Sequence, residues 1–267
     1  ILCGEIFMNP TQIKMLNILK KLKYDYGVLS VKAEFEAEGV RSDELIWLLE
    51  ISHKSNLQTA LKIGGCEAVR DLIDCVTFGC DYIVAPMIET DYSLSKFIGA
   101  IKSVYSDDEI SSTDFYINLE TISAFENLSK ITDEMVNSPV SGYVFGRVDF
   151  CGSLGFTREE INSDNVLNYA STVADNCIKN DLEFVVGGGV SNDSADFLKK
   201  LNEKKLNAFE TRKIIFNNSI LDGDLRKAIQ LAVKFELLYL QNKHDYYKQI
   251  TEEDLSRIKM LEARVNL

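Results

Sequence analysis

The chain has 267 residues, 46% of them hydrophobic, and a net charge of −12 at pH 7. This size suits one barrel-sized domain or two small ones. Lysine and arginine form no cluster, which argues against nucleic acid and anionic membranes as partners. No run reaches the roughly 20 apolar residues needed to cross a bilayer, and no signal-peptide pattern is present.

The cysteines and histidines narrow the chemistry further. The six cysteines include no Cys-x-x-Cys pair, which favours reduced thiols and a cytoplasmic location. The two histidines, His53 and His244, are far apart in the sequence and lie in charged or polar surroundings. Together these observations argue against a histidine-rich zinc site and a Ser-His-Asp triad.

Short apolar runs alternate with amphipathic segments along the chain. The first helix is predicted to begin near Asn9, with Asn9 or Thr11 as its cap and Pro10 in its first turn. The predicted strands cover residues 1–7, 27–36, 59–65, 81–88, 115–119, 143–145, 183–186 and 208–216. The helices predicted after the second to seventh of these strands lie within 43–52, 67–78, 92–104, 123–131, 159–178 and 191–204.

The strand–helix order repeats about eight times with short connections, and the strands are apolar throughout, as expected when both faces are covered. A closed (β/α)8 barrel and an open doubly wound sheet both have this pattern. An open sheet that binds a dinucleotide should carry Gly-x-Gly-x-x-Gly after its first strand, and this chain does not. We therefore predict an α/β protein with a TIM barrel.

The pattern changes after residue 222. A predicted helix within 225–240 is apolar on nearly every side, and a second helix is predicted over 252–265 with Thr251 as its cap. A terminal helix of this kind needs cover. We expect a catalytic barrel over residues 1–221 and a helical extension over 222–267 that packs on the barrel or on a neighbouring subunit.

One stretch, Gly142 to Gly155, combines an apolar strand with charged residues. The strand over 143–145 is followed by Arg147 and Asp149, which lie on one side of the backbone if it stays extended. The glycines allow sharp turns and bring backbone N–H groups close to an anion. The alternative interpretation is a surface turn with a solvated ion pair.

Several other predicted strands end in polar residues. In a parallel barrel all strands end at one rim, so we expect these groups to converge there. Carboxylates gathered at one mouth raise each other's pKa, and a divalent cation relieves that repulsion. Glu120 and Asp149 are hard oxygen ligands that select Mg²⁺ or Mn²⁺. The full set is Glu34, Glu36, Lys62, Glu89, Glu120, Arg147, Asp149, Gly187, Gly188, Gly189 and Arg212, of which Glu34 and Glu89 have outward or capping positions as the alternative.

Four segments carry a family resemblance. Residues 117–128 (INLETISAFENL) and Gly146-Arg-Val-Asp149, with Gly155 six residues later, resemble the "ET…A..N" and "G-x-x-D-L…G" segments of the HpcH/HpaI aldolase and citrate lyase β-subunit superfamily. Residues 31–36 and 83–87 resemble its "D-x-E" and "lP-K/M" strands. The likeness spans most of residues 27–216 in the same order.

This resemblance implies a metal-dependent (β/α)8 barrel that acts on 2-oxo acids or acyl-CoA thioesters. It implies that Glu120 and Asp149 hold the Mg²⁺ or Mn²⁺ ion, and that the backbone from Gly146 through Val148 to Asp149 receives the substrate carboxylate. A metal that chelates pyruvate stabilises the enolate formed when a C–C bond breaks or forms. Members of the family are commonly hexamers, so a homo-oligomer is expected.

Two positions depart from the family pattern. Lys62 stands where the family usually has an arginine, and a lysine supplies the charge without the bidentate geometry. Ala37 stands where the aldolases have a histidine and the citrate lyase subunits an aspartate, so proton transfer falls to Glu36, Glu34 or a metal-bound water. Arg147 and Arg212 are candidates for reading a second carboxylate or a phosphate, and Gly187-Gly188-Gly189 would suit a phosphate.

Three hypotheses follow. The first is a Mg²⁺- or Mn²⁺-dependent lyase or aldolase that works through a pyruvate enolate, with Lys62 polarising the carbonyl. The second is a Schiff-base aldolase with Lys62 as the nucleophile. The third is a barrel without catalytic activity that serves as a binding or assembly subunit. The sequence does not name the acceptor aldehyde or thioester, or the direction of reaction.

Overall fold

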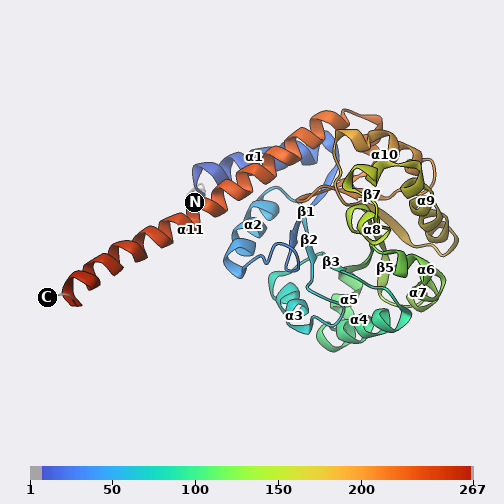
Figure 1. Ribbon diagram of the computed structural model, residues 1–267, viewed down its shortest axis with the longest axis horizontal. Coiled ribbons are helices and arrows are strands. Elements are labelled where there is room, and N and C mark those ends of the chain that lie inside the picture. Colours follow the sequence, from blue (N-terminus) through green and yellow to red (C-terminus); the bar gives the residue numbers. More distant parts are fainter. Residues whose placement is uncertain (1–7, 266–267) are drawn as a thin grey trace.

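The computed structural model describes residues 8–265 and is organised around a closed barrel of eight strands in the order β1 to β8 (Figure 1). The strand predicted over residues 1–7 lies outside the described residues. The strands are β1 (Val28–Glu34), β2 (Gln58–Lys62), β3 (Tyr82–Ala85), β4 (Asp114–Leu119), β5 (Val140–Gly146), β6 (Glu183–Gly187), β7 (Ala208–Glu210) and β8 (Ile214–Asn217). The predicted α/β barrel is therefore confirmed.

The barrel departs from eight parallel strands at its closure. Strands β1 to β7 pair in parallel, whereas β8 pairs antiparallel with both β7 and β1. The single strand predicted over 208–216 is in fact a hairpin that turns at residues 211–213. The backbone N–H of Thr211 donates to the Ile214 carbonyl over 2.9 Å. This turn contains no glycine, proline or asparagine, so the sequence carries no turn signal there.

Helices surround the barrel (Figure 1). The Asn9 side chain caps α1 as predicted, by accepting from the Gln12 N–H over 2.9 Å. The helix predicted over 123–131 is two short helices, and α5 was not predicted. The helices that precede the last one are α1 (Pro10–Tyr26), α2 (Ser42–Lys54), α3 (Val69–Phe78), α4 (Asp91–Val104), α5 (Asp107–Ser112), α6 (Ile122–Glu126), α7 (Leu128–Met135), α8 (Arg147–Ser153), α9 (Asp164–Lys179) and α10 (Ala195–Asn202). Three short 3₁₀ helices are η1 (Arg158–Asn162), η2 (Asn192–Ser194) and η3 (Asn218–Asp222).

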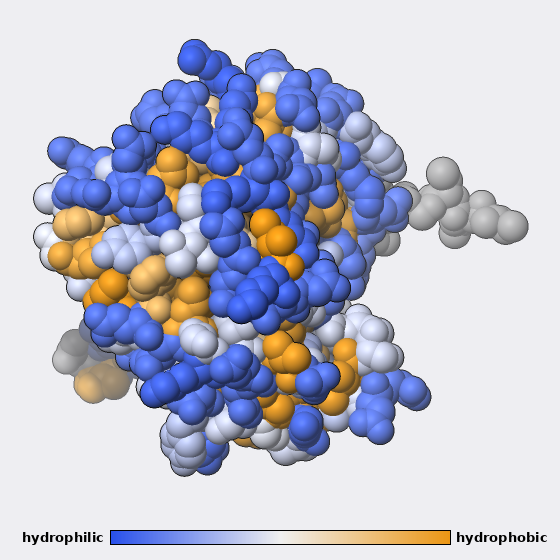
Figure 2. Space-filling view, turned by 90° about the vertical axis from the view of Figure 1, so that its right-hand side faces the viewer, coloured by the Kyte–Doolittle hydropathy of each residue, from blue (hydrophilic) through white to orange (hydrophobic). Residues whose placement is uncertain are grey.

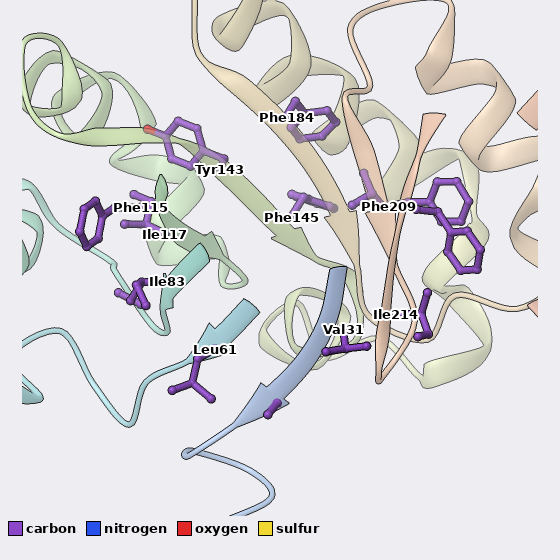
Figure 3. Packing of buried hydrophobic residues seen from close by; sticks show 14 of the residues in the cluster. Val31, Leu61, Ile83, Phe115, Ile117, Tyr143, Phe145, Phe184, Phe209 and Ile214 are labelled. Carbon is purple, nitrogen blue, oxygen red and sulfur yellow. The ribbon is translucent and has the colours of Figure 1, made fainter. Parts of the chain in front are cut away.

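The main hydrophobic core lies between the barrel strands and the surrounding helices. Figure 3 labels ten of its residues, which alternate along the strands with the residues that face the barrel interior. A smaller cluster that includes Tyr116, Val144 and Val185 fills the middle of the barrel itself. Because the core occupies both sides of the strands, the polar side chains are left to the strand ends.

The last helix, α11 (Leu225–Val265), is continuous where two helices were predicted. It pairs antiparallel with α1, because the Asn9 Nδ2 donates to the Asn242 Oδ1 over 2.7 Å while Gly27, after the other end of α1, lies against Ser219. Its buried side chains end at Asn242, and the remainder projects away from the barrel (Figure 1).

The side of the molecule that lies away from the C-terminal end of α11 is mostly hydrophilic. Figure 2 shows that hydrophilic side chains cover most of that face and that hydrophobic ones gather only in small patches. Within residues 8–265, no helix is both long enough and apolar enough to span a membrane. The cysteines at positions 66, 75, 80, 151 and 177 are free thiols.

A close approach between β5 and β6 leads to a prediction about stability. A Cβ added at Gly142 of β5 would lie 2.2 Å from the Glu183 carbonyl oxygen of β6, so Gly142→Ala must push two strands apart. We expect a loss of about 1–3 kcal/mol in the free energy of unfolding, measured by urea denaturation. The matched control is Gly99→Ala on the exposed side of α4, where an added Cβ meets nothing within 4 Å. That change should stabilise by up to about 1 kcal/mol.

Candidate active site

A polar cavity of about 760 Å³ opens at the C-terminal ends of the parallel strands. Its wall is completed by α11, which contributes Val233, Glu236 and Leu240 among others. The helix reaches this rim because β8 runs antiparallel, so that α11 starts at the opposite end of the barrel and climbs towards the mouth. The carboxyl ends of barrel strands are where catalytic residues gather in this architecture.

Glu120 follows β4 directly and is almost fully buried, with 2% of its surface exposed. Its Oε1 accepts from the Met87 backbone N–H over 3.1 Å, and its Oε2 accepts from the Asn118 Nδ2 over 2.6 Å. A Cβ at Gly146 would lie 2.9 Å from the Glu120 Cβ and 3.0 Å from its Oε2. Gly146 is therefore required for the carboxylate to occupy this position.

Lys62, at the end of β2, lies between two carboxylates. Its Nζ is 3.3 Å from the Glu120 Oε2 and 3.0 Å from the Glu36 Oε2. Burial favours the neutral amine, but the negative charges of Glu120 and Glu36 outweigh it and raise the pKa of Lys62. The side chain is thus held as an ammonium ion in the cavity wall.

A second buried lysine, Lys32 of β1, lies in the same cavity. Its Nζ contacts a Glu210 oxygen and lies 3.1 Å from the Glu34 Oε1. Burial opposes its charge, yet Glu210 and Glu34 raise the pKa of Lys32. Burial also disfavours the Glu34 carboxylate, but the Lys32 ammonium and the Arg212 guanidinium lower the pKa of Glu34 below its usual value.

Arg212 lies in the turn of the β7–β8 hairpin at the cavity rim. Its guanidinium contacts the Glu38 Oε1 at 3.1 Å and the Glu34 Oε2 at 3.7 Å. The neighbouring Lys213 is buried and contacts the other Glu38 oxygen. Arg212 was predicted to read a substrate anion, and both carboxylates near it already compete for its charge.

Arg147 and Asp149 do not share one side of an extended chain as predicted. The strand ends at Gly146, and α8 begins at Arg147, so residues two apart lie on nearly opposite sides of the helix. Asp149 is exposed and lines the cavity, whereas Arg147 is completely buried and does not. In this position Arg147 cannot touch a substrate, which corrects the predicted role.

The Arg147 guanidinium instead holds three loops together without a carboxylate. It donates to the Gly187 carbonyl over 3.0 Å, to the Asn162 Oδ1 over 2.5 Å and to the Ser194 Oγ over 3.4 Å, and it stacks over the Phe197 ring. Burial lowers the pKa of Arg147 to about 10. The residue therefore positions the segments at the rim around it.

The triple glycine lies beside the start of α8. Gly188 and Gly189 line the cavity, whereas Gly187 lies outside it and supplies a carbonyl to Arg147. A Cβ at Gly188 would come within 2.6 Å of the backbone nitrogens of Arg147 and Val148, and the positive φ of 75° at that residue also favours glycine. Only glycine allows the loop to approach α8 so closely.

Of the predicted site residues, the cavity brings together Glu34, Glu36, Lys62, Glu120, Gly146, Val148, Asp149, Gly188, Gly189 and Arg212. It leaves out Arg147 and Gly187, and Glu89 accepts from the Thr121 hydroxyl away from it. Lys32, Glu34 and Glu36 are each two residues apart, so an extended chain places them on one side. This spacing could have identified Lys32 as a site residue. Sequence reasoning missed Asn118, Arg158 and Glu210 as residues of the site.

The carboxylates present fit a divalent metal of the Mg²⁺ type. Among the residues that the structure describes, Glu120 Oε1 accepts one hydrogen bond and so retains an acceptor position, and Asp149 is exposed to the same cavity. Mg²⁺ is commonly held by one or two carboxylates, with water and substrate completing its shell. No group of three or more His, Cys, Asp or Glu side chains within residues 8–265 is arranged as a metal site, so such an ion would depend on these two.

Comparison with known proteins was informative at the level of family and fold. The HpcH/HpaI aldolase/citrate lyase family model matches residues 50–215. An HpcH/HpaI aldolase from Desulfitobacterium hafniense DCB-2 superimposes with a TM-score of 0.58 at 10% identity, over 74% of this chain and 80% of that one. A family protein from Burkholderia cenocepacia J2315 has a TM-score of 0.58 at 12% identity, over 72% and 82% of the two chains.

A variant of the citrate synthase SbnG has a TM-score of 0.55 at 14% identity, over 86% of this chain and 90% of that one. No curated protein matches the sequence. The structural likenesses show the shared fold, and the family model covers more than half of the chain, including Lys62, Glu120 and Asp149. The chain therefore belongs to the HpcH/HpaI aldolase/citrate lyase family.

Proposed function

We propose that the protein is a Mg²⁺- or Mn²⁺-dependent carbon–carbon lyase or aldolase that acts on a 2-oxo acid through a pyruvate enolate. The family supports lyase or aldolase activity. The observation that carries the finer proposal is that Glu120 and Asp149 line one cavity in which the Lys62 ammonium lies 3.3 Å from Glu120. Two acidic ligands and a fixed cation beside them suit a small, negatively charged keto acid.

The bound metal would be held by Glu120 and Asp149 and would supply Lewis-acid stabilisation of the negative charge that develops on the substrate. Lys62 lies beside that position and would place its positive charge near the keto oxygen. The backbone of Gly146 and Val148, at the positive end of the α8 dipole, would face the substrate carboxylate. Gly188 and Gly189 line the same side of the cavity.

Proton transfer is assigned to Glu36. Its Oε2 contacts Lys62 at 3.0 Å, and 30% of its side chain is exposed at the cavity. Glu34, the other candidate on β1, has one oxygen near Lys32 and the other near Arg212. Glu36 is thus the more accessible of the two, and it is in contact with the same cation that would polarise the carbonyl.

Removing either metal ligand should abolish the reaction. Glu120→Gln or Asp149→Asn should slow the metal-dependent exchange of pyruvate methyl protons in D₂O by about 100-fold or more, because the enolate loses its main charge stabilisation. The exchange is followed by NMR. The matched control, Asp164→Asn, changes an exposed carboxylate on α9 that pairs with Lys200 outside the cavity, and it should exchange like the wild type. Unchanged exchange of the wild type in excess EDTA would contradict the metal role.

The Schiff-base alternative requires a neutral amine at Lys62. The raised pKa of Lys62 opposes this requirement, since a nucleophilic lysine has its pKa lowered. We therefore expect no covalent adduct on Lys62 after treatment with borohydride and pyruvate, as measured by mass spectrometry of the intact protein and its peptides. A stable adduct at Lys62 would favour the metal-free mechanism instead.

We also propose that the protein is a homo-oligomer held together through α11. The second half of this helix carries exposed apolar residues at the three- and four-residue spacing of a helix interface, namely Ile258, Leu261 and Val265. This half has no buried side chain after Asn242, although helices in proteins gain most of their stability from packing of one apolar face. A second copy of the chain offers the same stripe and would cover it.

Charges placed in the stripe should break the oligomer. Ile258→Asp combined with Leu261→Asp should lower the molecular mass seen by light scattering to that of a monomer, because carboxylates would be buried at the interface. Ser256→Asp places one charge on the other side of the same helix and should leave the mass unchanged. An unaltered mass in the double variant would show that α11 is not the interface.

A further inference from the structure

The cationic side chains of the cavity differ in whether they form an ion pair. Five of them line it, and four are paired with carboxylates of the same chain. Lys32 is paired with Glu34 and Glu210, Lys62 with Glu36 and Glu120, Arg212 with Glu34 and Glu38, and Lys243 with Glu44. The fifth, Arg158, has no carboxylate within 4.0 Å among the residues that the structure describes.

Arg158 belongs to a segment whose packing contacts fix it at the cavity rim. It is the first residue of η1, and the last residue of η1, Asn162, accepts from the buried guanidinium of Arg147 over 2.5 Å. Ile161 of η1 packs so closely on the glycine loop that a Cβ at Gly189 would lie 2.9 Å from its Cδ1. The sequence of the loop and the buried arginine beneath it therefore fix where η1 lies.

The Arg158 guanidinium itself lies against this loop. Its Nη2 is 3.9 Å from the position that a Gly189 Cβ would take. Val148 and Asp149 line the cavity beside it, on the same side as the proposed carboxylate-binding backbone. A substrate bound near Asp149 therefore has Arg158 on the same side of the cavity.

The carboxylates of the cavity outnumber its cations, which makes an unpaired cation at the position of Arg158 important for binding an anion. Seven carboxylates line it, namely Glu34, Glu36, Glu38, Glu120, Asp149, Glu210 and Glu236. Such a wall repels the negatively charged end of any substrate, unless a cation is free to meet it. Of the five cations that residues 8–265 place in the cavity, only Arg158 can do so without giving up an existing ion pair.

We infer that Arg158 is a specificity-determining residue that binds an anionic group, a carboxylate or a phosphate, at the end of the substrate remote from the keto acid. This inference rests on the proposed function, because that function defines which end carries the keto acid. The planar guanidinium presents two parallel N–H donors to such an oxyanion, and a lysine at the same place would supply charge without that geometry. The preferred substrate therefore ends in a negative charge, where a neutral analogue of equal length ends in a methyl group.

Equilibrium binding tests this directly. Calorimetry with the full chain in Mg²⁺ would compare three unbranched 2-oxo acids of matched length, ending in a methyl group, a carboxylate or a phosphate. The wild type should bind at least one charged ligand about tenfold or more tightly than the methyl-ended one, as expected for a charge-assisted hydrogen bond. The stronger of the carboxylate and phosphate ligands identifies the natural group.

Three variants complete the design. Arg158→Gln should remove the preference and leave the affinity for the methyl-ended acid unchanged, while Arg158→Lys should retain part of it. Arg70→Gln, which changes an exposed arginine of α3 paired with Asp74 outside the cavity, should bind all three ligands like the wild type. Melting temperatures confirm that each variant is folded.

Two results would overturn the inference. One is a wild type that binds charged and neutral ligands equally, and the other is an Arg158→Gln variant that keeps the preference or weakens all three ligands alike. The pyruvate proton exchange separates this from the proposed function, since pyruvate has no remote end. If the wild type exchanges pyruvate protons but does not prefer charged ligands, only the role of Arg158 is refuted. If Arg158→Gln loses the preference for charged ligands but the wild type does not exchange pyruvate protons, only the enolate chemistry is refuted.

Discussion

The site depends on two ammonium groups placed among carboxylates inside the barrel. A carboxylate moved from water into a protein interior costs several kcal/mol unless it is neutralised and hydrogen-bonded. Lys32 and Lys62 lie on neighbouring strands and supply that neutralisation for Glu34, Glu36, Glu120 and Glu210. The carboxylates in turn raise the pKa of both lysines against the opposing effect of burial.

Much of the barrel and of its rim could be predicted because both follow local rules. Apolar runs gave the parallel strands, and the polar residues that follow them, such as Lys62 and Glu120, converge wherever such strands close into a barrel. The hairpin of β7 and β8 could not be predicted, because the turn at Thr211 and Arg212 has no turn-forming residue. Arg147 was misplaced because the strand was assumed to continue past Gly146. Arg158 was missed because its role depends on which other cations are already paired, which is a property of the folded chain.

Arg147 illustrates how a charged residue can serve a site without entering it. The guanidinium is satisfied by the Gly187 carbonyl, the Asn162 amide and the Ser194 hydroxyl, all neutral groups. Gly187 ends β6, Ser194 lies in η2 after the same strand, and Asn162 lies in η1 after α8, so one side chain sets the relative positions of the glycine loop, η1 and η2. The glycines at 188 and 189 then permit a close approach that larger residues would prevent. Arg147, which is buried beneath the rim, therefore controls the positions of the segments that form the rim.

The reversed eighth strand has a consequence for how the molecule presents itself. In a barrel of eight parallel strands, the helix after the last strand descends to the end remote from the catalytic rim. Here the direction of β8 inverts that path, and residues 243–265 extend from the catalytic side over about 35 Å of helix. Anything attached near Val265, whether an affinity tag or a fused domain, would sit on the side from which substrate enters. A domain fused after α11 would therefore lie nearer to the path of the substrate than one fused after the last helix of a barrel with eight parallel strands.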